Sequence, residues 1–198
     1  AVGEPRWWKR ALWRLEAKRI ARYEAAQALR FDRVVFVSEE DRRAVRNVAT
    51  VAERLALAQH STVVPICVDS SATEPLDVRP DAHRVTFLGT MLWPPNAEGV
   101  LWFAERVLPA VLEACPLAVF TVIGKQPPAA VRALERRFPG RVEVTGYLAD
   151  PTPLLRETAV FVVPLLSGGG MRVKILDAWL WGLPVVTTTL GAEGVDVR

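Results

Sequence analysis

Three consecutive glycines and two cations lie close together in the second half of the chain. Gly168, Gly169 and Gly170 are followed by Arg172 and Lys174. Glycines let the backbone approach a ligand closely, and the start of a following helix offers free N–H groups and a positive dipole end. Arginine grips phosphate oxygens through two bonds, whereas lysine acts more as a point charge. The spacing predicts a site for a phosphorylated sugar or nucleotide; the alternative is an ordinary βαβ unit with a solvated polar face.

A carboxylate follows these cations on the same predicted helix. At 100° per residue, Lys174, Asp177 and Trp181 share one helix face. We interpret Asp177 as an acceptor for sugar or ribose hydroxyls; the alternative is a surface acid paired with Lys174. The other face is apolar and is expected to pack on a sheet through Ile175, Leu176 and Trp179.

The segment around the glycines has the pattern of a βαβ unit. The first strand is predicted at Val160–Leu166, a β-branched run typical of a buried strand. A helix is predicted from about Met171 to Trp181, and a second strand at Pro184–Thr188. Further strands are predicted upstream at 85–89, 117–124 and 141–146. Helices are predicted at about 97–113, capped by Asn96, at 128–138, and near 151–158.

Strands that alternate with helices predict a parallel sheet covered on both faces, which is an α/β, Rossmann-like fold. Ligands of such sheets bind at the carboxyl ends of the strands. Gly89, Gly124 and Gly146 all follow strands, as does the triple glycine. Their convergence on one sheet edge supports a site there.

The first part of the chain predicts the end of a separate domain. A long helix is expected over 5–30, strands over 33–38 and 61–66, and a helix capped by Ser38 that continues to about Ala58. Residues 70–83 are polar and contain prolines, so we predict a linker there. The predicted organisation is the end of a first Rossmann-like domain (1–69), the linker (70–83) and a ligand-binding domain (84–198).

Composition limits the class of protein. The chain has 198 residues, of which 51% are hydrophobic and 24% charged, and two cysteines, Cys67 and Cys115, outside any spaced motif. We therefore expect a globular protein in a reducing, cytoplasmic setting, without a disulfide framework, signal peptide or membrane span. The first residue is not Met and the last follows a strand, so we expect a piece of a longer protein.

Positive charge is concentrated at the start of the chain. Residues 1–30 hold eight Lys and Arg against three Glu, although the whole chain has a net charge of only +3. Without a basic groove interleaved with aromatic residues, nucleic-acid binding is not expected. Tryptophans and cations within residues 6–22 are typical of a helix on a membrane surface; a helix packed on another part of the protein is the favoured alternative.

The sequence lacks the motifs of several common classes of catalytic and nucleotide-binding site. The sequence has no GxGxxG, Walker A or GxSxG motif, and His60 and His83 are not spaced as metal ligands. It also lacks an Asp-x-Asp pair, so we expect no metal ion to carry the diphosphate. Fixed cations and helix N–H groups would replace the metal. No catalytic residue can be assigned from the sequence.

Residues 84–198 resemble the nucleotide-sugar-binding domain of GT-B glycosyltransferases of family 4, the retaining group. The matching pieces are 85–103, 122–127, 142–150 and 164–195, and the segments 31–45 and 63–69 resemble the end of the acceptor domain. Family members commonly use two glutamates eight positions apart, where this chain has Gly169 and Asp177. The resemblance further implies that Arg172 and Lys174 bind the diphosphate and that the loop of Gly146, Tyr147 and Leu148 contacts the base.

The function expected from this resemblance is the transfer of a hexose from a nucleoside diphosphate sugar to a glycan or lipid-linked acceptor. The reaction would be retaining and metal-independent, and this piece alone would be inactive without its acceptor domain. A non-catalytic nucleotide-sugar-binding module and a GT-B-like epimerase are the alternatives. The predicted donor-binding residues are Gly89, Gly146, Tyr147, Leu148, Gly168, Gly169, Gly170, Met171, Arg172, Lys174 and Asp177.

Overall fold

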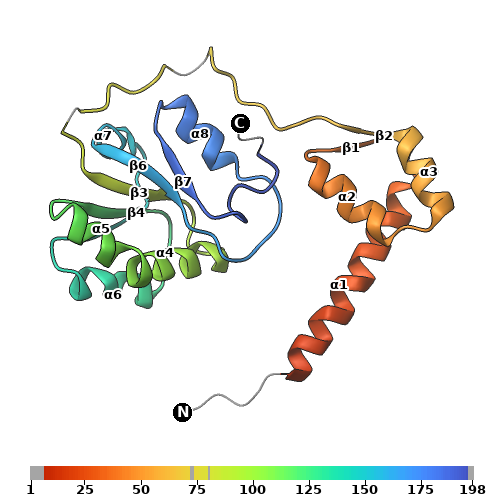
Figure 1. Ribbon diagram of the computed structural model, residues 1–198, viewed down its shortest axis with the longest axis horizontal. Coiled ribbons are helices and arrows are strands. Elements are labelled where there is room, and N and C mark those ends of the chain that lie inside the picture. The colour runs from red at the N-terminus through yellow and green to blue at the C-terminus, as the bar shows by residue number, and fades with distance from the viewer. Residues whose placement is uncertain (1–6, 72–73, 80, 196–198) are drawn as a thin grey trace. The chain divides into compact units, whose positions relative to one another are not determined.

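The computed structural model describes residues 7–71, 74–79 and 81–195, which form two compact units (Figure 1). The first unit ends at Ile66 and the second begins at Cys67. The first contains α1 (Trp7–Ala28), β1 (Val34–Phe36), α2 (Glu39–Val48), α3 (Val51–His60) and β2 (Ser61–Val63). Its strands pair in parallel, with Val34 opposite Ser61.

The helix predicted from Ser38 to about Ala58 is two helices, so that prediction was wrong about its length. Ser38 does cap α2, since its hydroxyl accepts from the Asp41 N–H at 3.0 Å. The break at Thr50 is a capping box, in which Thr50 and Glu53 satisfy each other's backbone N–H groups. The length prediction overlooked the Thr-x-x-Glu pattern, which is a helix-start signal.

The second unit is an α/β fold with helices on both faces of its sheet, as the sequence predicted. Its elements are β3 (Arg84–Leu88), α4 (Pro94–Arg106), α5 (Leu108–Ala114), β4 (Val119–Ile123), α6 (Ala129–Arg137), β5 (Val142–Gly146), α7 (Thr152–Leu155), β6 (Thr158–Val163), α8 (Val173–Leu180) and β7 (Val185–Thr187). All five strands are parallel, in the order β5-β4-β3-β6-β7.

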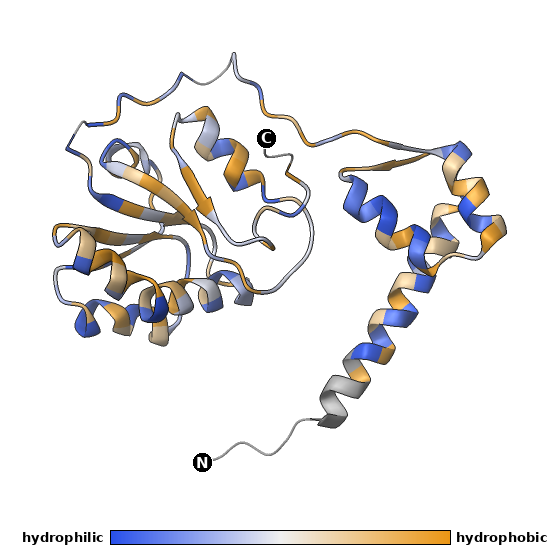
Figure 2. Cartoon of the chain, in the orientation of Figure 1, coloured by the Kyte–Doolittle hydropathy of each residue, from blue (hydrophilic) through white to orange (hydrophobic). Residues whose placement is uncertain are grey.

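Two apolar cores lie on the two faces of this sheet. On one face, α4, α5 and α6 pack around Phe87, Phe103 and Phe120. On the other face, α8 packs on Phe161 and Val163. Figure 2 shows the apolar residues concentrated in the strands of this sheet. Strands buried on both faces read as continuous apolar runs, which is why the sequence identified them.

Three predictions about the helices of this unit were wrong. Asn96 is not a cap, because Pro94 occupies the first position of α4 and Asn96 lies inside its first turn. The predicted 97–113 helix is divided near Val107 into α4 and α5. Trp179 does not face the sheet: its side chain is 42% exposed, and the small Ala178 beside it is fully buried instead.

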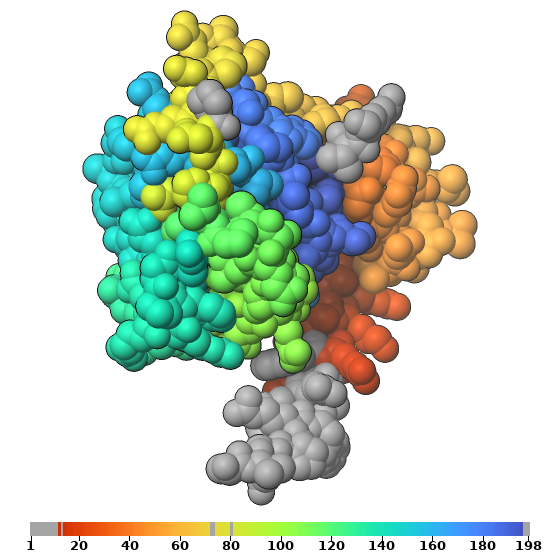
Figure 3. Space-filling view, turned by 60° about the vertical axis from the view of Figure 1, so that its left-hand side comes forward, coloured from red at the N-terminus to blue at the C-terminus, as the bar shows by residue number. Residues whose placement is uncertain are grey.

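The segment predicted as a linker packs on the second unit where the structure describes it. The Leu76 N–H donates to the Trp181 carbonyl at 3.0 Å, and the Arg79 N–H donates to the Arg156 carbonyl at 2.9 Å. Leu76 and Val78 also cover the core on the α8 face. In Figure 3 this yellow segment lies on the surface of the second unit.

No helix within the described residues has both the length and the apolar composition needed to cross a bilayer. The tryptophan side chains at 7, 8 and 13, and residue 6, lie outside what the structure describes. On α1, Leu12, Leu15, Ile20 and Tyr23 are exposed.

Candidate functional site

The strand order creates a natural ligand position at one sheet edge. After β3, the chain adds β4 and β5 on one side and then β6 and β7 on the other. Where the connections that follow two neighbouring strands run towards opposite sides of the sheet, a crevice opens at the carboxyl ends of those strands. The loop after β3 begins at Gly89, and the loop after β6 contains the triple glycine. The topology therefore brings these two predicted site segments together.

Lys174, at the start of α8, reaches the carboxyl end of β3. Its Nζ donates to Asn96 Oδ1 at 3.1 Å and lies 4.4 Å from the centre of the Phe87 ring. Burial, together with a smaller effect of the positive charge of Arg172, lowers the pKa of Lys174 from 10.5 to about 8. The structure thus places an ammonium group in a largely desolvated position at the predicted site.

The backbone around Lys174 leaves room for this ammonium. A Cβ at Gly89 would lie 2.6 Å from Lys174 Nζ and 3.0 Å from Asn96 Nδ2. The same Nδ2 donates to the Thr90 carbonyl at 2.7 Å, which fixes the orientation of the Asn96 amide. A side chain at residue 89 would therefore displace the Lys174 ammonium from its present position, and Asn96 positions Lys174. Sequence reasoning missed this role, because an Asn before an apolar run was interpreted as a helix cap.

Arg172 is a buried cation with unused donors. Its side chain stacks on Trp93, 5.2 Å from the ring centre, and its Nη1 donates to the Gly169 carbonyl at 2.7 Å. The residue is only 6% exposed, yet Nε and Nη2 have no hydrogen-bond partner in the described chain. Burial lowers the pKa of Arg172, and the negative charge of Glu193 partly opposes this. Buried donors without partners are rare and suggest a missing acceptor.

The glycine loop is shaped by Trp93, which sequence reasoning also missed. A Cβ at Gly168 would meet the Trp93 ring at 2.8 Å, and the φ of +95° at this residue favours glycine. By contrast, a Cβ at Gly169 or Gly170 would meet no atom within 4 Å. The loop is thus packed at Gly168 and open at the next two residues, so its backbone is accessible to a ligand.

A row of glycines continues along the same edge towards β5. The Gly124 N–H donates to the Gly146 carbonyl at 2.8 Å, and a Cβ at Gly124 would lie only 1.9 Å from the Gly89 carbonyl oxygen. Tyr147 is exposed, and Lys125 Nζ lies 4.4 Å from its ring centre. The predicted base-contacting residues Gly146, Tyr147 and Leu148 therefore begin at this edge, two strands away from β3.

The remaining predicted residues have weaker local evidence. Met171 is half-buried beside Arg172. Asp177 is half-buried, and burial raises the pKa of its carboxyl. The alternative role of Asp177, as a partner of Lys174, has no support, since the described contacts of the Lys174 ammonium are to Asn96 and Phe87.

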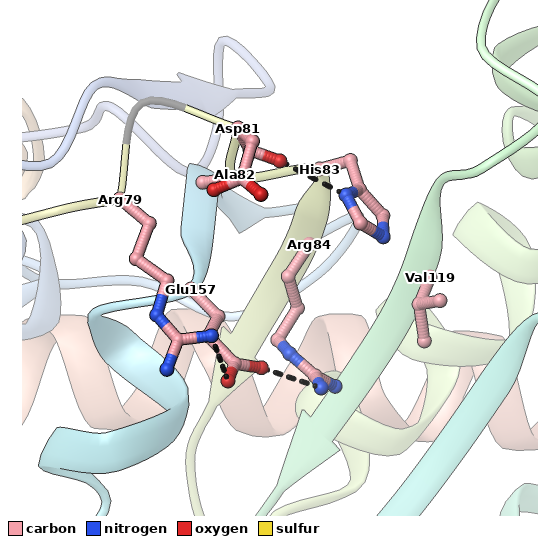
Figure 4. Close-up of a pocket in the computed structure, with 7 residues that line it drawn as sticks. All are labelled: Arg79, Asp81, Ala82, His83, Arg84, Val119 and Glu157. Carbon is pink, nitrogen blue, oxygen red and sulfur yellow. Dashed lines mark hydrogen bonds and ion pairs between the residues drawn. The ribbon is translucent and has the colours of Figure 1, made fainter.

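A pocket lies at the opposite edge of the sheet, among the first residues of β3 and β4 and the residue before β6 (Figure 4). It has a volume of about 120 Å³ and is lined by Arg79, Asp81, Ala82, His83, Arg84, Val119 and Glu157. Its main charges are paired, since Glu157 binds both Arg79 at 3.2 Å and Arg84 at 3.0 Å. We therefore interpret it as part of the framework. Within the described residues, no three His, Cys, Asp or Glu side chains gather as metal ligands.

Comparison with known proteins supports a specific family. Residues 82–197 match the family described as glycosyl transferases group 1. An uncharacterized 44.6 kDa protein in the cps region of Klebsiella pneumoniae is 26% identical over 128 residues, which cover 60% of this chain and 32% of that protein. The chain thus spans about a third of this curated relative.

Solved structures share the fold at low sequence identity. Anabaena Alr3699/HepE in complex with UDP and glucose has a TM-score of 0.64 and 18% identity, over 88% of this chain and 50% of that one. TarM has a TM-score of 0.69 and 16% identity, over 88% and 33%. The pneumococcal O-GlcNAc transferase GtfA in complex with UDP and GlcNAc has a TM-score of 0.60 and 13% identity, over 85% and 32%.

Proposed function

Since this chain belongs to the glycosyl transferases group 1 family, we propose that its second unit binds the nucleoside diphosphate sugar of a GT-B glycosyltransferase. The resemblance and the fold class predicted from the sequence are confirmed. The observation that carries the proposal is the buried guanidinium of Arg172. Its Nε and Nη2 have no partner among the described residues, and it lies on the loop beside the half-buried Lys174. A diphosphate would supply acceptors for both cations.

The proposed contacts with the diphosphate also suggest how Arg172 and Lys174 act in transfer. Negative charge grows on the departing diphosphate as its bond to the sugar breaks, and fixed donors in a desolvated site stabilise such charge. In this proposal, Arg172 and Lys174 supply this stabilisation in place of a metal ion. We propose metal-independent, retaining transfer of a hexose; the groups that activate the acceptor would lie elsewhere in the whole protein.

The relatives suggest the ligand and acceptor to test first. The HepE and GtfA structures are described with UDP, so we propose a uridine nucleotide ahead of guanosine or adenosine. The Klebsiella relative lies in a cps region, which supports a glycan or lipid-linked acceptor in polysaccharide synthesis. We place the protein in the cytoplasm, with α1 as a candidate for peripheral membrane contact.

The binding part of the proposal is tested by NMR titration of the chain with UDP, GDP and ADP at millimolar concentration, in EDTA and then in Mg²⁺. We expect one nucleotide to shift the amides of Gly89, Gly168–Gly170 and Lys174, equally with and without Mg²⁺. Shifts that require Mg²⁺ would overturn metal independence. A folded chain whose amides respond to none of the three would overturn donor binding.

A non-catalytic binding module is the second candidate, and one observation favours it. The position at which the family resemblance expects the first glutamate is Gly169, which faces open space and has no carboxylate. The transferase and the non-catalytic module are distinguished by measuring whether the whole protein transfers labelled sugar from a nucleotide sugar to acceptors in a membrane extract. Binding without transfer supports the module, and accumulation of an isomerised nucleotide sugar without acceptor would instead indicate an epimerase.

A further inference from the structure

A second unpaired charge lies near Arg172, on a segment that sequence analysis did not select. Glu193 lies in the turn that follows β7, and its Oε2 is buried without a hydrogen-bond partner. In the described part of the chain, the buried Nε and Nη2 of Arg172 are also unpartnered. The negative charge of Glu193 nevertheless raises the pKa of Arg172 against the effect of burial. The turn also contacts the loop that leads to Arg172, since the Thr188 hydroxyl donates to the Leu165 carbonyl, three residues before Gly168. These opposite charges attract while their buried atoms remain unpaired with each other.

The turn that carries Glu193 is fixed to the end of β6. The Thr187 hydroxyl donates to the Val163 carbonyl at 2.9 Å, and the Gly191 N–H donates to Thr188 Oγ1 at 2.9 Å. A Cβ at Gly191 would lie 2.7 Å from the Val163 oxygen, so this approach requires glycine. Glu193 is thus held at the carboxyl end of the strand that leads into the triple glycine.

Within the glycine loop itself there is no side chain that can accept a hydrogen bond from a sugar. Gly168, Gly169 and Gly170 offer only backbone, and the last two face open space. An acid that contacts a sugar beside this loop must therefore come from another element. Glu193 meets this requirement because its Oε2 is buried without a partner, its turn is anchored to the end of β6, and its charge acts on Arg172.

One class of ligand would satisfy both unpaired groups at once. A guanidinium pairs with phosphate oxygens, and a carboxylate accepts hydrogen bonds from hydroxyl groups. In a nucleoside diphosphate sugar, the second phosphate is bonded directly to a ring that carries hydroxyl groups. Neighbouring groups of the same molecule would thus reach the two neighbouring side chains.

We propose that Glu193 is a donor-binding residue that accepts a hydrogen bond from a hydroxyl group of the transferred sugar, while Arg172 binds the adjacent phosphate. This inference rests on the proposed function. It assigns to the turn after β7 the sugar-binding carboxylate that the glycine loop lacks. It also predicts that Glu193 distinguishes a nucleotide sugar from the same nucleotide without its sugar.

The test compares UDP and UDP-glucose in NMR titrations of the wild-type chain, Glu193→Gln and Glu113→Gln. The last variant makes the same change at an exposed position of α5 and serves as the control. Glu193→Gln keeps the size of the side chain and removes the charged acceptor. We expect it to weaken UDP-glucose binding about tenfold, to leave UDP binding unchanged or tighter, and to weaken saturation transfer to the glucose protons.

The outcomes separate this inference from the proposed function. If the wild-type chain binds UDP and Glu193→Gln binds UDP-glucose equally well, the inference is overturned and the proposed function stands. An equal loss for UDP and UDP-glucose also overturns the inference, because the contact would then be to the ribose or would be structural. If the wild-type chain binds neither UDP nor UDP-glucose, and also neither GDP nor GDP-mannose, both the proposed donor binding and the proposed role of Glu193 are overturned.

Discussion

Two largely buried arginines at opposite edges of the same sheet have opposite surroundings. Arg84, at the start of β3, donates to Thr121 and Glu143 and pairs with Glu157. Arg172, beyond the end of β6, keeps Nε and Nη2 without partners. Satisfied charges stabilise a structure, whereas unsatisfied buried ones reduce its stability and are typical of binding sites. The comparison supports our interpretation of the edge where the strands begin (the amino edge) as framework, and our proposal that the edge where they end (the carboxyl edge) binds the ligand.

The largest expected effect is on stability, at the amino edge. We expect Arg84→Met to lower the free energy of unfolding of the second unit by about 2–3 kcal/mol, because Glu143 and Glu157 lose their shared cation. Hydrogen exchange of the β3 and β4 amides measures this loss. The exposed Arg106→Met is the control and should change less than about 0.5 kcal/mol. A loss below that value at Arg84 would remove the contrast between the edges.

The same substitution at the other edge should affect binding instead. We expect Arg172→Met to weaken nucleotide binding by about tenfold to a hundredfold, because charge-assisted hydrogen bonds to phosphate are lost. The free energy of unfolding should change by less than about 1 kcal/mol, because the substitution also removes unpaired buried donors. NMR titration and hydrogen exchange report the two quantities. If Arg172→Met destabilises the unit as much as Arg84→Met does, Arg172 is part of the framework.

The next effect is on pH dependence, through Lys174. Its pKa in the folded chain is about 8, below the ordinary 10.5, so the protonated side chain disfavours the fold at neutral pH. Stability should therefore rise as the pH increases from about 8 to about 10.5. Nucleotide affinity should instead decrease with pH. We expect it to fall about tenfold between about pH 7 and about pH 9, because only the ammonium form of Lys174 attracts phosphate.

Titration of UDP binding across this pH range measures the affinity of the chain and of Lys174→Met. The variant should bind more weakly and show no such fall. A wild-type affinity that stays constant to about pH 9 would mean that Lys174 does not contact the phosphates.

The smallest expected effect is at Asn96. Asn96→Asp would give Lys174 a charged partner, raise the pKa of the lysine and compete with the phosphates for its ammonium. We expect nucleotide affinity to fall about threefold and its pH-dependent loss to move to higher pH. Asn47→Asp, exposed on α2, adds the same charge in the first unit and serves as the control. An unchanged pH dependence in Asn96→Asp would contradict the positioning role of Asn96.

Much of the fold could be predicted because its signals are local. Buried parallel strands such as β6 read as continuous β-branched runs, and the glycines after them mark the strand ends. Helix ends were less certain, because they depend on single residues: Pro94 moved the start of α4 upstream of Asn96, and Thr50 divided a predicted helix. These signals were present in the sequence but were given too little weight.

The cations of the site could be predicted, but their partners could not. Arg172 and Lys174 lie in one short segment with the glycines, whereas Trp93, Asn96 and Glu193 join them only through the strand order. A tryptophan followed by two prolines reads as a loop, and nothing local indicates that its ring meets Gly168. Sequence spacing predicts which side chains lie together within one helix or loop. It does not predict which side chains from different elements come together in the fold.

The strand order also has a kinetic consequence. The central strand β3 pairs with β4, which follows it in the chain after α4 and α5. Its other neighbour, β6, starts only at Thr158. Pairings between distant segments form slowly, because a long loop must close before its contacts contribute. We therefore expect the β3–β4–β5 half to fold first. The candidate site at the carboxyl ends of β3 and β6 would then be completed late, so a nucleotide could bind only after most of the unit had folded.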